Sequence, residues 1–259
     1  MRQFLSLVLL CFVLCPRRTI SNPQCLENPP NLDPNSGSGH VTKIGGLKAY
    51  VSGSSHSKRG IILVSDVYGY EAPNLRKIAD KVAAAGFYAV VPDYFFGDPY
   101  KIEYKEKRPV PVWIKDHPPA KGFNDSKPVI EALKRKGITT IGATGICWGA
   151  KVVVELAKTD LIQAAVFFHP SYVTVDDIKE VKAPLAIFGA EFDGGSPPAL
   201  LKQFEQILAA KSDVKSCVKI FPNVKHGWTV RYNVTDPVAV KAAEEAHNDM
   251  LQWFATLLQ

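Results

Sequence analysis

Short apolar runs alternate along this chain with segments whose apolar residues recur at helical spacing. The runs at residues 60–65, 88–91, 140–144, 164–168, 186–192 and 216–221 are typical of buried strands. Apolar residues that share one helical face predict helices at residues 74–85, 127–136, 150–158, 198–210 and 237–258. This alternation predicts an α/β fold, in which a mostly parallel sheet has helices on both faces.

Three segments depart from the alternation. Residues 22–40 are rich in Pro, Asn, Gly and Ser and predict an irregular N-terminal arm, and residues 47–51 predict a short edge strand. Residues 100–122 mix Lys, Pro and aromatic residues. We interpret them as a solvated loop, and the alternative is a lid that closes on substrate with Tyr104 and Trp113.

The composition fits one globular domain, which we expect at residues 41–259. The 259 residues are 46% hydrophobic and 22% charged, and α/β folds of this length often form a single core. The formal net charge is +6, but Arg2, Arg17 and Arg18 lie in the first 21 residues. The remaining excess is small and dispersed, which argues against a nucleic-acid partner.

Residues 1–21 are interpreted as a probable signal peptide. One arginine precedes an apolar run at residues 5–14, which is too short for a stable membrane span. We therefore expect the secretory pathway or an extracellular location, with the cytoplasm as the alternative. Asn124 and Asn233 each begin a glycosylation tripeptide, and the sequence does not determine whether either is used.

The run GICWG at residues 145–149 places a thiol where hydrolases hold their nucleophile. It has the Gly-x-nucleophile-x-Gly form of a nucleophile elbow, between a predicted strand and a predicted helix. The flanking glycines are needed because a Cβ there would meet the neighbouring strand and helix. The pattern predicts Cys147 as a nucleophile, and the alternative is an ordinary buried cysteine.

Two further strand ends complete a candidate triad. Asp193 follows the apolar run at 186–192, and His226 follows the run that starts at residue 216. Nucleophile, acid and histidine in this order are the chain order of an α/β-hydrolase. His226 would take up the thiol proton, and Asp193 would hold the imidazole tautomer.

The other cysteines suggest no metal site by their spacing. Loss of the first 21 residues would leave Cys25, Cys147 and Cys217, so at least one thiol stays free or pairs with another molecule. If Cys25 and Cys217 were bridged, Cys147 would be the free one. Neither these cysteines nor the histidines show a metal-ligand spacing.

Taken together, these motifs resemble the dienelactone hydrolase family, and within it the plant members. The resemblance extends from about residue 39 to the end, and it includes VSDVYG at 64–69 and HGWTVR at 226–231. It implies an α/β-hydrolase fold with no large cap domain and a cysteine nucleophile. It also implies hydrolysis of a small-molecule ester or lactone without a cofactor. The oligomeric state stays open.

The resemblance assigns roles around the thiol. Asp66 matches the family's acidic residue that contacts the resting thiol and gates its ionisation, although the family type is a glutamate. The alternative for Asp66 is a strand-end aspartate that accepts backbone hydrogen bonds. By position, the backbone N–H groups of Trp148 and Val67 would stabilise an oxyanion.

Substrate-binding residues are less defined. Arg231 lies soon after the histidine and is a candidate to bind a substrate carboxylate, with a surface salt bridge as the alternative. Tyr94 and Trp228 are candidates to line an apolar pocket, with a plain core position as the alternative.

Two other functions stay open at this point. Some plant relatives carry an endo-1,3;1,4-β-D-glucanase name, but glycoside hydrolysis needs two free carboxylates, and Asp193 is assigned to His226. A non-catalytic binding protein on the same fold is the second alternative, and the presence of all three triad residues argues against it.

Overall fold

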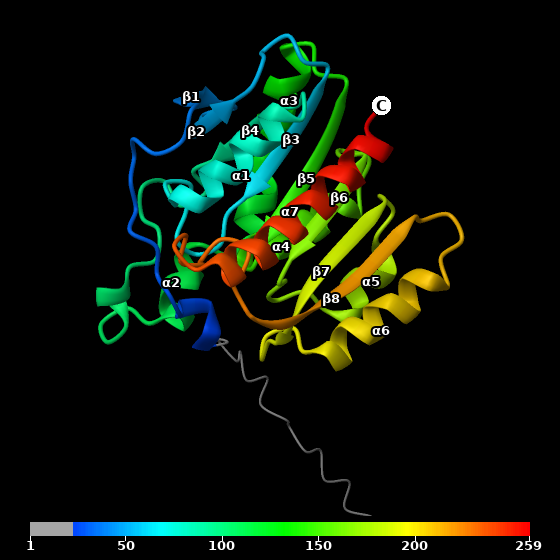
Figure 1. Ribbon diagram of the computed structural model, residues 1–259. Coiled ribbons are helices and arrows are strands. Elements are labelled where there is room, and N and C mark those ends of the chain that lie inside the picture. Colours follow the sequence, from blue (N-terminus) through cyan, green and yellow to red (C-terminus); the bar gives the residue numbers. More distant parts are fainter. Residues whose placement is uncertain (1–22) are drawn as a thin grey trace, which may run out of the picture.

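A single eight-stranded sheet organises the chain in the computed structural model, which describes residues 23–259 (Figure 1). The strand order is β1-β2-β4-β3-β5-β6-β7-β8. Every pairing from β4 to β8 is parallel, and β2 runs antiparallel to both of its neighbours. The predicted α/β architecture is confirmed. The probable signal peptide at 1–21 lies outside the described residues.

The strands are short and mostly buried. Their bounds are β1 His40–Ile44, β2 Leu47–Ser52, β3 Arg59–Val64, β4 Tyr88–Pro92, β5 Thr140–Ile146, β6 Ala164–Phe168, β7 Leu185–Phe192 and β8 Ser216–Lys225. All residues of β4 and β6 are buried, as expected for parallel strands covered on both faces.

Helices cover both faces of the sheet. Their bounds are α1 Pro73–Ala84, α2 Val110–Asp116, α3 Pro119–Arg135, α4 Trp148–Ala157, α5 Val175–Glu180, α6 Pro198–Ala209 and α7 Pro237–Leu257, with short 3-10 helices η1 Pro23–Leu26 and η2 Ile102–Tyr104. Helices α1 and α7 pack on one face of the sheet. The opposite face is covered by α3, α4, α5 and α6, each in contact with the next (Figure 1).

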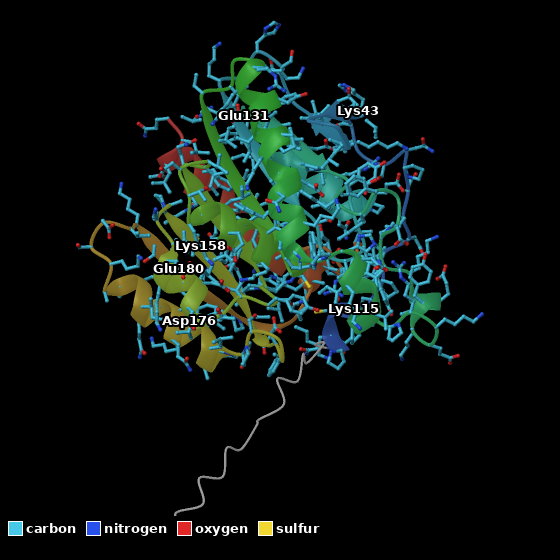
Figure 2. The ribbon with its side chains drawn as sticks, turned by 180° about the vertical axis from the view of Figure 1, so that it is seen from behind. Lys43, Lys115, Glu131, Lys158, Asp176 and Glu180 are labelled. Atoms are coloured by element: carbon cyan, nitrogen blue, oxygen red, sulfur yellow. The ribbon has the colours of Figure 1, made fainter. Side chains whose placement is uncertain are left out.

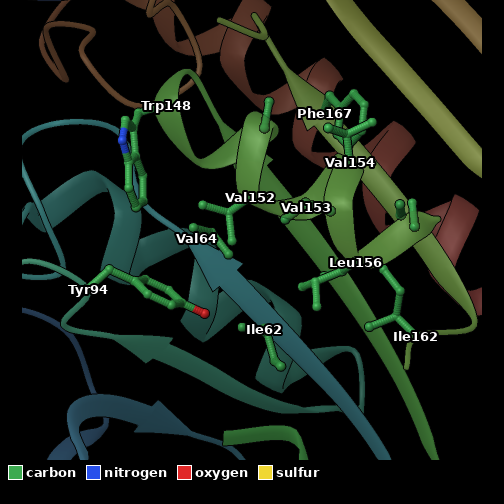
Figure 3. Close-up of a cluster of buried hydrophobic side chains, with 14 of the residues drawn as sticks. Ile62, Val64, Tyr94, Trp148, Val152, Val153, Val154, Leu156, Ile162 and Phe167 are labelled. Atoms are coloured by element: carbon green, nitrogen blue, oxygen red, sulfur yellow. The ribbon is translucent and has the colours of Figure 1, made fainter. Parts of the chain in front are cut away.

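Each face of the sheet has its own core. On the face of α4, Val152, Val153 and Trp148 pack against Ile62 and Val64 of β3 (Figure 3). On the other face, Phe254 and Met250 of α7 are fully buried with residues of α1. These two layers hold the central strands rigidly, so the loops at their carboxyl ends start from fixed positions.

The strand predicted at residues 47–51 is present as β2, but it is not an edge strand. Strand β2 pairs with β1 on one side and β4 on the other, so β1 is the edge. Strand β1 reads HVTKI, and only Ile44 is buried. A strand that leaves most of its side chains in solvent carries no continuous apolar run, and the hydrophobic pattern therefore missed it.

The solvated-loop interpretation of residues 100–122 is also wrong, because the segment forms η2, α2 and the start of α3. Trp113 is 0% exposed and packs edge-on against Phe95. Prolines at 111 and 119 suggested a loop, yet they lie in the first turn of a helix. There the missing N–H of proline has no helical partner to lose.

Polar residues tie the short helix α5 to α4. The Asp177 carboxylate accepts hydrogen bonds from Lys151 at 2.6 Å and from Lys158 at 2.8 Å. It also accepts from the Thr174 amide at 2.8 Å and completes a capping box. Figure 2 shows Lys158 and Glu180 beside each other in this region, with the exposed Asp176 nearby.

None of the helices within residues 23–259 is both long and apolar enough to cross a membrane.

Candidate active site

A strained turn between β5 and α4 presents the Cys147 thiol. Cys147 has a φ of 53°, in the left-handed region that residues with a Cβ rarely adopt. A Cβ on Gly145 would lie 2.5 Å from the carbonyl oxygen of Gly149, and one on Gly149 would lie 2.3 Å from that of Val64. Only glycine fits at these two positions, which explains the elbow pattern.

The histidine and the acid meet beside this turn. His226 Nδ1 lies 2.7 Å from Asp193 Oδ2, and both side chains are shielded from solvent. Asp193 also accepts from the amide of Gly195 at 2.8 Å and from the Ser196 hydroxyl at 3.1 Å. This geometry holds one imidazole nitrogen at the carboxylate and directs Nε2 toward the sulfur atoms.

Cys147 and His226 titrate as a pair. Burial raises the pKa of the Cys147 thiol well above its usual value, so the thiol rests protonated. Burial alone would lower the pKa of His226, but once the thiol has lost its proton, the negative charge on Cys147 and the bond to Asp193 raise the pKa of the imidazole to about 9. A proton that leaves the thiol therefore goes to the imidazole, and the thiolate forms together with the imidazolium.

The N-terminal arm brings a second cysteine into the site. Helix η1, at the blue end of the ribbon in Figure 1, places Cys25 Sγ 3.4 Å from Cys147 Sγ and 3.6 Å from His226 Nε2. Ser171, in the loop after β6, lies 3.4 Å from Cys147 Sγ and 3.5 Å from Cys25 Sγ. Cys25 is 3% and Ser171 4% exposed. Neither residue belongs to a recognisable motif, so sequence reasoning had no signal for them.

Side chains of the hydrolase domain hold the arm in place. Arg231 Nη1 donates to the carbonyl oxygens of Gln24 at 3.1 Å, Cys25 at 2.8 Å and Glu27 at 2.8 Å. The Tyr68 hydroxyl donates to the Leu26 carbonyl at 2.9 Å. The Gln24 side chain spans the end of β7, where it donates to the Phe192 carbonyl and accepts from the Gly194 amide. The arm thus covers the thiol.

Asp66 lies beside Arg231 and not against the thiol. Its Oδ2 is 3.4 Å from Arg231 Nε, and its Oδ1 accepts from the Tyr68 amide at 3.0 Å. Burial raises the pKa of Asp66, and the Arg231 charge offsets part of that rise. The gating role assigned by resemblance would require Asp66 to exchange this partner for Cys147.

The two aromatic candidates for a substrate pocket both lie in the core. Tyr94 packs against Trp148 (Figure 3), and its hydroxyl lies 2.8 Å from Ser126 Oγ. The Trp228 ring is 5.3 Å from that of His169, which in turn is 4.7 Å from the His226 ring. Trp228 is therefore separated from His226 by the ring of His169.

A disulfide between Cys25 and Cys217, which the sequence left open, does not form in this structure. Cys217 is exposed near the start of β8, whereas Cys25 is buried beside Cys147. All three are free thiols. The chain topology separates Cys25 from Cys217 because the arm runs to the opposite end of the sheet, where β7 and β8 finish.

Comparison with known proteins identifies the family of this chain. The model of the dienelactone hydrolase family matches residues 47–258. An endo-1,3;1,4-β-D-glucanase of Zea mays is 42% identical over 75% of this chain, and the match spans 64% of that relative's length. A carboxymethylenebutenolidase homolog of Xenopus tropicalis is 31% identical over 83% of this chain and 89% of its own.

Solved structures show the same fold. A Klebsiella pneumoniae protein assigned as a dienelactone hydrolase superposes with a TM-score of 0.68 at 21% identity, over 81% of this chain and 92% of its own. The chain belongs to the dienelactone hydrolase family, with an α/β-hydrolase fold. It is an enzyme of the class that hydrolyses ester or lactone bonds.

Proposed function

We propose that the chain hydrolyses a small ester or lactone with Cys147 as nucleophile, His226 as base and Asp193 as the residue that orients His226. One observation carries this proposal. A buried thiol in a left-handed turn lies within 4.8 Å of a histidine nitrogen, and that histidine is bonded to a buried carboxylate at 2.7 Å. This is the arrangement that nucleophilic acyl transfer needs.

The reaction follows from these positions. His226 takes the thiol proton, and the Cys147 thiolate attacks the substrate carbonyl carbon. Trp148 begins α4, so its N–H has no acceptor within the helix and is available, with the Val67 N–H, to stabilise the oxyanion. The imidazolium then protonates the leaving alcohol oxygen. Water, deprotonated by His226, hydrolyses the thioester and releases the acid.

The substrate reaches Cys147 only after the arm moves. Cys147 is 0% exposed, and Cys25 Sγ covers its sulfur at a distance of 3.4 Å. When residues 23–27 leave, the Arg231 Nη1 group loses three carbonyl partners and faces the vacated space. A cation freed there suits an ester or lactone that carries a carboxylate.

The β-glucanase alternative lacks a free pair of carboxylates in this site. Asp193 is bonded to His226, and Asp66 is buried against Arg231. A glycosidase needs one carboxyl group as acid and another as base or nucleophile. The site therefore favours thiol chemistry over glycoside hydrolysis.

The test compares the purified chain with its Cys147→Ala variant on p-nitrophenyl acetate, a dienelactone and mixed-linkage β-glucan. Cys217→Ala is the matched control, because Cys217 is a free thiol far from the site. We expect Cys147→Ala to lower ester or lactone turnover by about 10³-fold or more, and Cys217→Ala to leave it unchanged. Glucan cleavage that persists in Cys147→Ala would overturn the proposal.

A further inference from the structure

Two thiols and an imidazole converge at the active site. Cys25 Sγ, Cys147 Sγ and His226 Nε2 come from η1, the β5–α4 turn and the loop after β8, and the three ligand atoms all lie within 4.8 Å of one another. All three residues are buried. Hydrolysis as proposed uses Cys147 and His226 and gives Cys25 no part. The cluster therefore contains a donor that catalysis does not explain.

Two of the three separations between the donor atoms are close to those around a tetrahedral zinc ion, and the third lies within 4.8 Å. Zinc binds thiolate sulfur at about 2.3 Å and histidine nitrogen at about 2.0–2.1 Å, which puts two sulfurs about 3.8 Å apart and sulfur about 3.6 Å from nitrogen. Here Cys25 Sγ lies 3.4 Å from Cys147 Sγ and 3.6 Å from His226 Nε2. Small rotations of the two thiols would complete the fit.

The surroundings provide a fourth position and an outer shell. Ser171 Oγ lies 3.4 and 3.5 Å from the two sulfurs, so its hydroxyl or a water beside it would close the tetrahedron. His226 Nδ1 is bonded to Asp193 at 2.7 Å. A carboxylate on the outer nitrogen is the usual partner of a metal-binding histidine, because it fixes the ring and the tautomer.

We propose that Cys25, Cys147 and His226 bind one Zn²⁺ ion when the N-terminal arm is closed. Binding releases the two thiol protons and places both sulfurs and Nε2 on the metal. The nucleophile and the base are then occupied together, so the zinc form is inactive. The metal also joins the arm to the hydrolase domain, which adds to the hydrogen bonds from Arg231 and Tyr68.

Two thiolates and an imidazole select the class of ion. Soft sulfur donors favour Zn²⁺ and ions of similar preference over Mg²⁺ or Ca²⁺, which take oxygen ligands. Substrate and metal compete for the same sulfur, and only the metal uses Cys25. Loss of Cys25 therefore separates metal binding from the proposed hydrolysis.

The test uses Co²⁺ as a probe of the full purified chain, reduced with a phosphine and freed of metal by EDTA and dialysis. We expect one Co²⁺ per chain, the strong visible absorption of tetrahedral cobalt and a sulfur-to-cobalt charge-transfer band. One equivalent of Zn²⁺ should remove both signals. Absence of tetrahedral absorption in the wild-type chain would overturn the proposal.

Two variants test the cysteine ligands, and a third is the control. Cys25→Ser and Cys147→Ser should each lower the charge-transfer band and weaken cobalt affinity at least 10-fold, whereas Cys217→Ser should bind as the wild type does. Thermal unfolding without metal confirms that each variant is folded. Equal cobalt affinity in Cys25→Ser and wild type would also overturn the site. Ester turnover, measured in EDTA, tests the proposed function independently of these spectra.

Discussion

Removal of one hydrogen bond from the arm should expose the buried thiol more often. The Tyr68 hydroxyl donates to the Leu26 carbonyl at 2.9 Å, and Tyr68→Phe deletes only that oxygen. A hydrogen bond of this kind contributes about 0.5–1.5 kcal/mol, which corresponds to a factor of about 2 to 13 in an equilibrium constant. The population in which the arm is open should rise by that factor.

Alkylation by iodoacetamide measures that population. Cys147 is 0% exposed, so the reagent reaches its sulfur only in the open state. When opening and closing are fast, the alkylation rate follows the open fraction. Cys217 is exposed and free and reports reagent activity in the same molecule. Peptide mass spectrometry should show the ratio of Cys147 to Cys217 labelling rates rising about 2- to 13-fold in Tyr68→Phe.

Tyr100→Phe is the matched control. The Tyr100 hydroxyl is buried and, among residues 23–259, has no hydrogen-bond partner, so its removal breaks no bond. We expect the labelling ratio of this variant to equal that of the wild type. If Tyr68→Phe also left the ratio unchanged, or if both variants raised it equally, the arm would not control access to Cys147.

Two further predictions concern the proposed role of Asp193 and the stability of the fold. Asp193→Asn should lower kcat on p-nitrophenyl acetate by about 10³- to 10⁴-fold with little change in KM, because the imidazole loses its tautomer; a change confined to KM would contradict this role. Burial alone would raise the pKa of Asp177, but hydrogen bonds from two lysines lower it to about 2. A lowered pKa stabilises the folded chain above the unfolded value of 3.8, and that gain is lost as the pH falls toward 2. Asp177→Asn should therefore lower the free energy of unfolding by about 2 kcal/mol at pH 7, and by progressively less below pH 4. Urea titration should show little effect of Asp176→Asn, since that side chain is 85% exposed; equal losses in both variants would refute the buried ion pair.

Local patterns predicted most of the sheet and its helices. Parallel strands such as β4 and β6 are buried on both faces, so each is a continuous apolar run that can be recognised without tertiary information. The pattern failed at β1, which leaves most of its residues in solvent. It also failed at residues 100–122, where prolines that begin α2 and α3 resembled loop residues.

The elbow and the order of the triad candidates are local features, and the sequence alone was enough to identify them. Gly145 and Gly149 have to lack a Cβ because backbone oxygens lie within 2.5 Å of where it would be. Because no other residue fits at these two positions, the turn can be recognised in the sequence as a short motif. Asp193 and His226 follow strands that the hydrophobic pattern also predicted, and parallel strands bring their carboxyl ends together.

Only the tertiary structure decided what covers the thiol. Cys25 is 122 residues from Cys147 in the sequence, and no spacing rule joins two residues so far apart. Their contact depends on the three carbonyls that Arg231 holds and on the Tyr68 hydroxyl bond. Hydrogen bonds to backbone carbonyls depend on where the arm lies and not on its side chains, so they leave no pattern in the sequence. The sequence by itself determined the glycine-flanked turn that holds Cys147 and the sheet that presents it, and the folded arm determined which side chains surround the thiol.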